Sequence, residues 1–461
     1  MTEFEWALHP HAEALVDRLV AEAVAKSPSV AGFSDRLARA TSTRLQDWLD
    51  SVQGPVTADE LAALGFRYLD AQQLWRHPGA QLPAVVAGDH YQLGIRVDDV
   101  EAFARVHGGG VAGSPLSGYR TACLAEHNGV RLMGVERRSW ASGLLPECLG
   151  AEQSRRAEQA WAVLAERPRQ LYGADGVRAQ LASARRAVEL VGADLAASYF
   201  LQQERQFWQS RNSAGAAQHA RQDALGLGWG NNDHHTFRSS RAAFRPLIEF
   251  LDALGFGLRE RFYAGAEAGW GAQVLEHPGC GGVIFADVDL MPAEVDLDFA
   301  RAGLPEATGP ADDATGPADD ATGPAHDATG PAALGTVGMW CALHGESVLG
   351  AGMHHLEGQF SFAELTAELA GLGHESMPPF SDFEHLRQAF TEAEWWPVPG
   401  PRLAALVEQA QLSPERAAEI AATGAAGSHL ENLARRGGFK GFNQHNVSVT
   451  MLATHPRDYR R

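Results

Sequence analysis

The sequence predicts an α+β fold in which paired βαβββ modules form a half-open β-barrel, with helical insertions. Two observations lead to this prediction. An order of strand, helix and further strands occurs between residues 89 and 137, and the same order returns between residues 233 and 290. Because two half-open modules can pair and enclose a cleft that neither forms alone, the repetition indicates a paired architecture.

Length and composition favour a globular protein of more than one unit. The chain has 461 residues, above the roughly 250–300 at which a single hydrophobic core stops growing. Its formal net charge is -19, and we find no dense stripe of Lys and Arg. A chain with this charge repels nucleic acid and anionic lipid, so we expect a small-molecule partner, no nucleic acid and no membrane.

The cysteine positions and the hydropathy of the chain indicate the cellular compartment in which the protein is found. The four cysteines lie far apart with no CxxC pair, which argues against a zinc ribbon and against a disulfide-rich secreted scaffold. The stretch MTEFEWALHP is acidic, and no run of 18 apolar residues occurs. We therefore expect a cytoplasmic protein.

The first region, residues 1–87, is predicted to be helical. Apolar residues recur at helical spacing from Pro10 to about Lys26, and Thr57 is suited to cap a short helix. Residues 70–86 have a loop-like composition, so we expect an irregular connection there.

A first βαβββ-like module is predicted over residues 88–150. It contains an alternating run at 90–97, a helical segment at 99–106, and two strand-like runs on either side of Asn128 and Gly129. An Asn-Gly pair between alternating residues is a strong hairpin signal.

The module order returns after a helical bridge at residues 151–230. The second βαβββ module is predicted over residues 231–300, with strands at 233–240, 257–265, 270–278 and 281–290 and a helix at 244–254. Residues 301–335 contain repeats of ATGPADD, a composition that cannot bury apolar surface and that predicts a flexible linker. Residues 336–461 are expected to form a C-terminal α/β region with a possible third module and a lid.

Histidines open the leading strands of both predicted modules. His90 opens the first, and His234 or His235 opens the second. If the modules pair about a pseudo-twofold axis, the starts of equivalent strands converge and bring two imidazoles into one cleft. Two neutral histidines and one carboxylate leave open positions on Fe(II), where oxygen and a chelating substrate can bind.

The expected carboxylate lies on a closing strand. Asp287 and Asp289 are two residues apart and share one face of the last strand of the second module, and Glu136 lies on the last strand of the first. Acids on a core strand are costly to bury unless they are neutralised or coordinate a cation. We therefore predict Asp287 as a metal ligand, with Asp289 or a nearby acid as its rival.

Two of these segments resemble a known family. The run NDHHTFRS at 232–239 and FADVD at 285–289 resemble the metal module of the 2-oxoadipate dioxygenase/decarboxylase family. That family is a modified member of the vicinal oxygen chelate superfamily. The resemblance implies a vicinal oxygen chelate-like fold and a non-heme iron enzyme.

The resemblance also implies roles for individual residues. By it, His90, His234 and Asp287 would be ligands of Fe(II). Arg238 or Arg96 would bind a substrate carboxylate and take part in catalysis. This chain has Asp where the family has Glu, and its arginine follows His90 at a longer spacing.

A second arrangement stays open, in which His354 and His355 replace His90. These two histidines precede a strand-like and then helical segment, as the histidines of the second module do. The paired modules would then be the second and third, with Glu357 or His374 nearby.

A Gly-, His- and Asn-rich stretch at 437–452 is a candidate lid. It contains Lys440, Gln444 and His445, and its glycines permit a close approach of backbone to ligand. We expect Lys440 and Gln444 to contact the substrate.

These features predict a non-heme Fe(II)-dependent dioxygenase and oxidative decarboxylase that acts on a small 2-oxo or 2-hydroxy acid with O2. The metal would act as a template and electron source. Two alternatives remain open: a metal-dependent isomerase or lyase that uses Zn2+ or another divalent ion, and a metal-free module that sequesters a small molecule. An aromatic groove for such a molecule could use Trp270, Trp340, Trp395 and Trp396.

Overall fold

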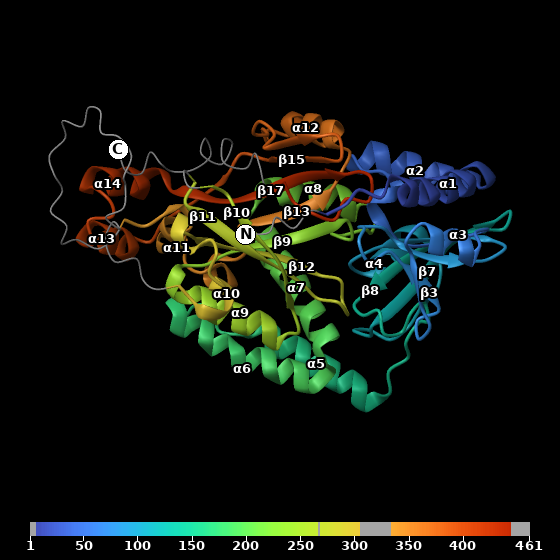
Figure 1. Cartoon of the computed structure of the whole chain (residues 1–461), viewed down its shortest axis with the longest axis horizontal. Helices are drawn as coiled ribbons and strands as arrows, with labels where there is room; N and C mark the ends of the chain where they lie inside the picture. Colours follow the sequence, from blue (N-terminus) through green and yellow to red (C-terminus); the bar gives the residue numbers. More distant parts are fainter. Residues whose placement is uncertain (1–5, 266–267, 305–332, 444–461) are drawn as a thin grey trace.

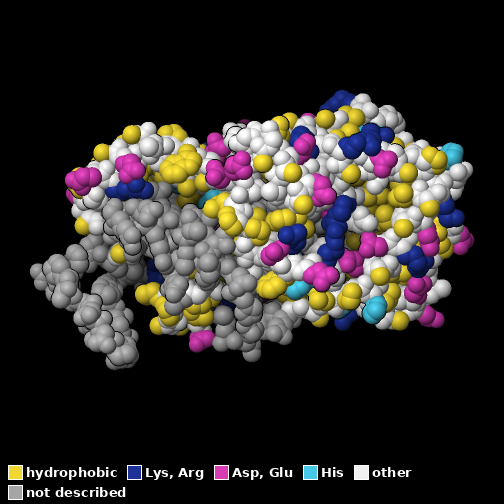
Figure 2. All heavy atoms as spheres, turned by 90° about the horizontal axis from the view of Figure 1, so that it is seen from above, with side chains coloured by type: hydrophobic (Ala, Val, Ile, Leu, Met, Phe, Trp, Pro, Cys, Tyr) yellow, Lys and Arg dark blue, Asp and Glu magenta, His cyan; other side chains and the backbone are white. Residues whose placement is uncertain are grey.

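The computed structural model describes residues 6–265, 268–304 and 333–443. It is a mixed α+β structure in which curled sheets form half-barrels and helices pack against them (Figure 1). The predicted fold class is therefore confirmed. On the face drawn in Figure 2, Lys and Arg side chains lie among Asp and Glu side chains rather than in one broad patch.

The amino-terminal sheet has eight strands in the order β2-β3-β4-β1-β5-β8-β7-β6. Its strands are β1 (Leu49–Gly54), β2 (Arg67–Leu69), β3 (Leu74–Arg76), β4 (Ala84–Ala87), β5 (Tyr91–Arg96), β6 (Val111–Ala112), β7 (Tyr119–His127) and β8 (Val130–Arg137). Its helices are α1 (Pro10–Lys26), α2 (Pro28–Thr41), the short η1 (Leu45–Trp48), α3 (Ala58–Ala63) and α4 (Val100–His107). Helix α1 packs against β1 and β5, the antiparallel pair at the centre of the sheet.

The second sheet has nine strands, eight of them in the order β10-β11-β12-β9-β13-β17-β15-β14, with β16 paired to β17. Its strands are β9 (Asn232–Arg238), β10 (Gly257–Tyr263), β11 (Trp270–Glu276), β12 (Val283–Asp289), β13 (His355–Gln359), β14 (Ser381–Phe383), β15 (Leu386–Phe390), β16 (Glu394–Trp396) and β17 (Ala425–Arg435). Strands β9 and β13 form its antiparallel centre, and each pairs in parallel on its other side, with β12 and β17 respectively.

The two sheets share one topology. In each, two βαβββ modules meet through their first strands, and each first strand pairs in parallel with the last strand of its own module. The four modules span residues 49–87, 91–137, 232–289 and 355–435. The fold is therefore two half-barrels, each built from two modules.

The pairing differs from the expected one. The module at 91–137 pairs with residues 49–87, and the module at 232–289 pairs with residues 355–435. We expected residues 49–87 to lie in a helical region, but they contain four strands. Three of these strands have only three or four residues, too short for a recognisable alternating pattern, and β1, with six residues, does not alternate.

The remaining helices connect the half-barrels or flank the second sheet. The bridge consists of α5 (Ala151–Ala165), α6 (Gly173–Val191), α7 (Ala193–Gln209) and α8 (Ser213–Asp223). The second half also contains α9 (Arg241–Ala253), η2 (Pro292–Glu294), α10 (Phe299–Ala302), α11 (Thr336–His344), η3 (Ser347–Ala351), α12 (Phe362–Gly371), α13 (Gly400–Glu408) and α14 (Pro414–Thr423). Among the described residues, no helix is long and apolar enough to cross a membrane.

Strand alternation divides β9 between two environments. Phe237 stacks on Phe200 of α7, and His235 contacts Arg205 of the same helix, so these odd-numbered side chains face the helical layer. His234, Thr236 and Arg238 therefore face the other side, which is the concave face of the half-barrel. This alternation places polar residues inside the curled sheet.

A buried ion pair joins β1 to the end of β8 in the first half-barrel. Arg137 Nε lies 2.6 Å from Asp50 Oδ1, and its second nitrogen, Nη2, lies 2.7 Å from Oδ2. The two side chains are 0% and 1% exposed. Removal of one partner would leave the other charge buried and unpaired.

We predict that Asp50→Ala lowers the free energy of unfolding by about 3–5 kcal/mol, the usual effect of breaking a buried pair. The shift is measured by urea unfolding, followed by far-UV circular dichroism. Glu126→Ala, which removes an exposed ion pair with Arg131, serves as the control, because such pairs contribute roughly 0–1 kcal/mol. Equal midpoints for the two variants would contradict the prediction.

Candidate functional site

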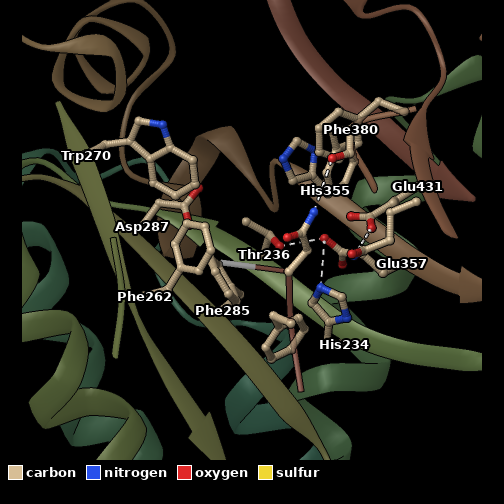
Figure 3. A pocket seen from close by; sticks show the side chains of 14 residues that line it. His234, Thr236, Phe262, Trp270, Phe285, Asp287, His355, Glu357, Phe380 and Glu431 are labelled. Atoms are coloured by element: carbon tan, nitrogen blue, oxygen red, sulfur yellow. Dashed lines mark hydrogen bonds and ion pairs between the residues drawn. The ribbon is translucent and has the colours of Figure 1, made fainter. Parts of the chain in front are cut away.

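A small cavity lies on the concave face of the second half-barrel (Figure 3). It encloses about 50 Å³, which is room for an ion with a few waters or for part of a small ligand. Aromatic side chains form one part of its wall: Phe262, Trp270, Phe285, Phe380, Phe390 and Phe442. Polar side chains form the rest: His234, Thr236, Asp287, His355, Glu357, Gln388, Glu431 and Asn443.

Three of the polar residues lie in one row across adjacent strands. His234 on β9 is the register partner of Glu357 on β13, which is the register partner of Glu431 on β17. Register partners project from the same face of a sheet, so these side chains converge. One possible ligand atom from each lies within 4.8 Å of the others, and His234 Nε2 lies 3.6 Å from Glu357 Oε1. We call these three residues the His-Glu-Glu group.

The orientation of His234 is set by its neighbour Asp233. His234 Nδ1 lies 2.9 Å from Asp233 Oδ1, and Arg435 donates two hydrogen bonds of 2.9 Å to the same carboxylate. Burial alone would raise the pKa of Asp233, but the charge of Arg435 and the bond from His234 hold that pKa below its usual value. Burial lowers the pKa of His234. A neutral His234 therefore carries its proton on Nδ1, and the Nε2 lone pair faces the two glutamates.

The two carboxylates are held by neutral donors. Thr236 Oγ1 donates to Glu357 Oε1 at 2.5 Å, and Gln388 Nε2 donates to Glu431 Oε1 at 2.7 Å. Among the described residues, Glu357 Oε2 is buried with no hydrogen-bond partner. Burial raises the pKa of both glutamates, and the charge of Glu431 adds to the effect at Glu357.

These observations fit a bound divalent cation. Buried carboxylates are costly unless they are neutralised or coordinate a cation, and an ion would also give Glu357 Oε2 a partner. One imidazole nitrogen and two carboxylates form a donor set that suits Fe(II), Mn(II) and Zn(II). The His-Glu-Glu group is therefore a candidate metal centre.

The structure does not bring His90 to this centre. His90 precedes β5 in the first half-barrel, where its exposed ring bonds to Gln53. Because β5 pairs with β1 and β8 rather than with β9, His90 and His234 lie in different sheets. Arg96 also belongs to the first sheet, and it lines a separate polar pocket with Arg205.

Asp287 lines the cavity but lies outside the His-Glu-Glu group. Its Oδ2 lies 3.6 Å from Arg238 Nε. Among the described residues, Asp287 Oδ1 and Arg238 Nε have no hydrogen-bond partner. Burial raises the pKa of Asp287 to about 7. Its rival Asp289 instead accepts backbone N–H groups of Val337 and Gly338 at the start of α11, which is a capping role.

The expected lid residues divide between two environments. Lys440 pairs with Glu276 at 2.9 Å and does not line the cavity, whereas Phe442 of the same segment does. Gln444 and His445 lie outside the described residues.

The second module pairs with the third, as in the alternative arrangement, and this pairing brings residues other than His90 to the site. Strand β9 pairs with β13, which brings Glu357 beside His234. His355 lines the cavity, and His354 and His374 do not.

Sequence reasoning missed Glu431. The tripeptide His-Leu-Glu occurs at 355–357 and again at 429–431, and in the structure the two copies lie side by side in parallel register. This repetition is a signal in the sequence that could have located Glu431. It is short, and it becomes meaningful only when the two strands are known to be neighbours.

No protein-family model and no curated protein matches this chain. Among solved structures, a mutant of 4-hydroxymandelate synthase from Streptomyces coelicolor is similar, with a TM-score of 0.29 and 12% sequence identity. The alignment covers 89% of this chain and 98% of that chain.

We predict that Asp233→Asn weakens metal binding by the His-Glu-Glu group about 10–100-fold, because a metal-ligating histidine depends on the carboxylate that fixes its tautomer. The affinity is measured by calorimetric titration with Mn2+, an air-stable ion that accepts the same donors. Asp98→Asn is the control, because Asp98 pairs with Arg205 at 2.8 Å and does not contact His234. Equal Mn2+ affinities for both variants would argue against this role of Asp233.

Proposed function

We propose that this protein is a metal-dependent enzyme and that its His-Glu-Glu group binds one Fe(II) ion. We infer further that it is a dioxygenase and oxidative decarboxylase that acts on a small 2-oxo or 2-hydroxy acid with O2. The observation that supports this most is the position of His234 Nε2, 3.6 Å from Glu357 Oε1 and turned toward a pair of buried carboxylates. Such a row of donors on one sheet face leaves the opposite positions of an ion open to ligands.

Bound Fe(II) would supply a template and an electron source for the reaction of the substrate with O2. The donor set differs from the familiar iron triad of two histidines and one carboxylate, because it has one histidine and two carboxylates. The second carboxylate contributes another negative charge.

The chain's own residues would position the ligands and exclude water. Asp233 keeps the proton of His234 on Nδ1, and Thr236 and Gln388 hold one oxygen of each glutamate. The aromatic wall shields the polar row from solvent, which strengthens electrostatic interactions inside the cavity. Its volume of about 50 Å³ favours a small substrate.

Arg238 is the residue that we propose for the substrate's carboxylate. Its Nε has no hydrogen-bond partner among the described residues, and it lies 3.6 Å from Asp287, which lines the cavity. Arginine binds carboxylates through paired hydrogen bonds, so an acid group at this end of the cavity would be both neutralised and oriented.

A redox-neutral isomerase or lyase on the same centre is the second candidate. The observation in its favour is the pair Glu357 and Glu431, whose pKa values are both raised by burial. A carboxyl group that holds a proton near neutral pH is suited to acid–base catalysis. The buried carboxylates argue against a metal-free module, because an apolar ligand would leave them without partners.

We expect the wild-type protein, loaded anaerobically with Fe(II), to retain one iron ion in the His-Glu-Glu group and to consume O2 when a suitable 2-oxo acid is added. His234→Ala should lose that iron and the O2 uptake. Iron is counted by mass spectrometry, and O2 uptake is followed with an electrode over a panel of 2-oxo acids. His235→Gln is the matched control, because His235 is the next residue on β9 and faces the helical layer.

The outcomes separate the candidates. Iron retention without O2 uptake by any acid in the panel would favour the isomerase or lyase. Equal iron retention by wild type and His234→Ala would overturn the metal centre itself.

A further inference from the structure

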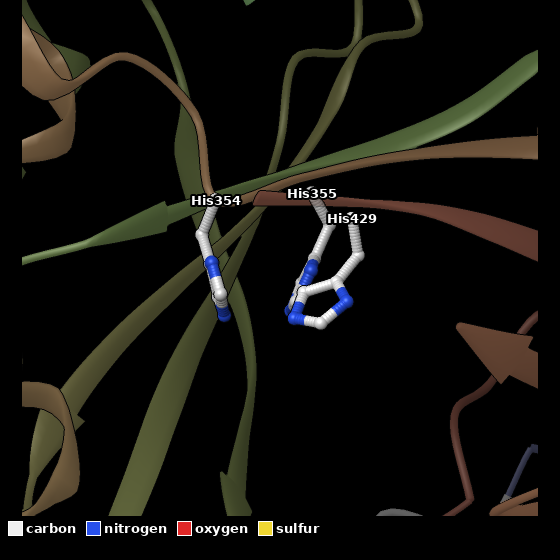
Figure 4. A group of neighbouring side chains, drawn as sticks. All are labelled: His354, His355 and His429. Carbon is white, nitrogen blue, oxygen red and sulfur yellow. The ribbon is translucent and has the colours of Figure 1, made fainter. Parts of the chain in front are cut away.

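Three buried histidines lie one row along from the His-Glu-Glu group. His355 on β13 is the register partner of His429 on β17, two residues before the partners Glu357 and Glu431. His354 precedes β13, and its ring centroid lies 3.8 Å from that of His355. The three imidazoles project to the same side of the strands (Figure 4). We call His354, His355 and His429 the three-histidine group.

Two of these imidazoles have a defined tautomer. His354 Nδ1 lies 2.8 Å from the carbonyl oxygen of Gly427, and His429 Nδ1 lies 2.8 Å from that of Thr391. A carbonyl oxygen only accepts, so both Nδ1 atoms carry a proton and donate it. A neutral ring with its proton on Nδ1 has its lone pair on Nε2. Metal-ligating histidines commonly donate their other ring N–H in this way.

The Nε2 atoms of His354 and His429 differ in their hydrogen bonding from those of His277, a histidine with a structural role. His277 has both ring nitrogens engaged, with Nε2 bonded to the carbonyl of Leu254 and Nδ1 accepting two backbone N–H groups. Within the described part of the chain, Nε2 of His354 and Nε2 of His429 have no hydrogen-bond partner.

The spacing of the group suits a metal ion. One possible ligand atom from each histidine lies within 4.8 Å of the others. A point equidistant from three atoms at that separation lies about 2.8 Å from each, compared with about 2.0–2.1 Å for a zinc–nitrogen bond. Movement of each imidazole by less than about 1 Å, which side-chain rotation can supply, would complete the site.

The surrounding charges partly balance an added cation. Arg238 is a cation near His354 and His429, and its charge opposes the binding of a metal ion. Asp287 pairs with that arginine, and Glu357 and Glu431 stand one row away, roughly 7 Å along the strands. A divalent ion therefore enters a region where the three carboxyl groups, when ionised, would offset the charge of one arginine.

We propose that the three-histidine group is a second metal site, which binds a divalent transition ion of the zinc type beside the His-Glu-Glu group. Three neutral imidazoles are a ligand set for Zn2+ that leaves a fourth position for water or a substrate. His355 also lines the cavity, so that position is reachable from it. The proposal rests on these three histidines and stands whether or not the neighbouring group binds iron.

The test counts Zn2+ ions on the full chain. The protein is stripped with a chelator and dialysed against Zn2+, and bound metal is counted by mass spectrometry. We expect two Zn2+ ions per wild-type chain, one in His429→Gln, one in His234→Ala and none in the double variant. His344→Gln is the matched control and should keep both ions, because half-buried His344 packs on Trp340 but lies outside the group.

Cobalt gives a second measurement that does not involve activity. Co2+ absorbs visible light more strongly at a four-coordinate, nitrogen-rich site than at an oxygen-rich one, so we expect the strong band to persist in His234→Ala and to be lost in His429→Gln. If circular dichroism shows that His429→Gln is unfolded, His354→Gln is compared in its place.

The Zn2+ counts of the variants distinguish the two proposed metal sites. An unchanged Zn2+ count in a folded variant of the three-histidine group would overturn the second site. Loss of one ion in that variant, with no loss in His234→Ala, would support the second site and overturn the His-Glu-Glu centre.

Discussion

The buried ion pair between Asp233 and Arg435 is the interaction on which the rest of the site depends. Its two hydrogen bonds of 2.9 Å connect β9 to β17, which are separated in the sheet by β13. Gln81 of the first half and Gln359 of β13 donate to the same carboxylate. Desolvation makes such a pair a weak source of stability, so its main consequence here is geometric. It keeps Asp233 ionised and thereby fixes the tautomer of His234.

The two half-barrels share a topology and differ in how they treat buried acids. In the first, Asp50 pairs with Arg137, and Glu136 pairs with Arg120 and Arg138. In the second, Glu357 and Glu431 receive hydrogen bonds from neutral side chains, and burial raises the pKa of each. The same arrangement of strands thus surrounds buried acids that are paired with arginines in the first half and a candidate metal centre in the second. The chemistry belongs to the site and not to the fold.

The period of a β-strand explains why the two candidate metal sites lie side by side. In each His-Leu-Glu tripeptide, the histidine and the glutamate point to the concave face, and the leucine points to the opposite face. Leu356 and Leu430 are accordingly fully buried in the main hydrophobic core. Because β13 and β17 pair in parallel with the two tripeptides in register, His355 lies beside His429 and Glu357 lies beside Glu431.

Local patterns in the sequence anticipated much of the second module and part of its site. The alternating run around His234 and the helical spacing after it correspond to β9 and α9, and His234 lies in the candidate metal centre. The sequence points to Glu357 only within the alternative pairing of the second and third modules. Glu431 was missed, because the strand that carries it follows two helices and the repeated His-Leu-Glu tripeptide becomes meaningful only once β13 and β17 are known to be neighbours.

By itself the sequence determined the local elements: the strand alternation, the helix spacing and the hairpin at Asn128 and Gly129. Only the tertiary structure decided which modules pair. Backbone hydrogen bonds between strands are the same for any residue, so they do not select the partner of a strand. The partner is selected by which side chains become buried on each face of the sheet, and each side chain contributes only a small part of that free energy. That selection joined β9 to β13 and β17, which separated His234 from His90 and placed it beside Glu357 and Glu431.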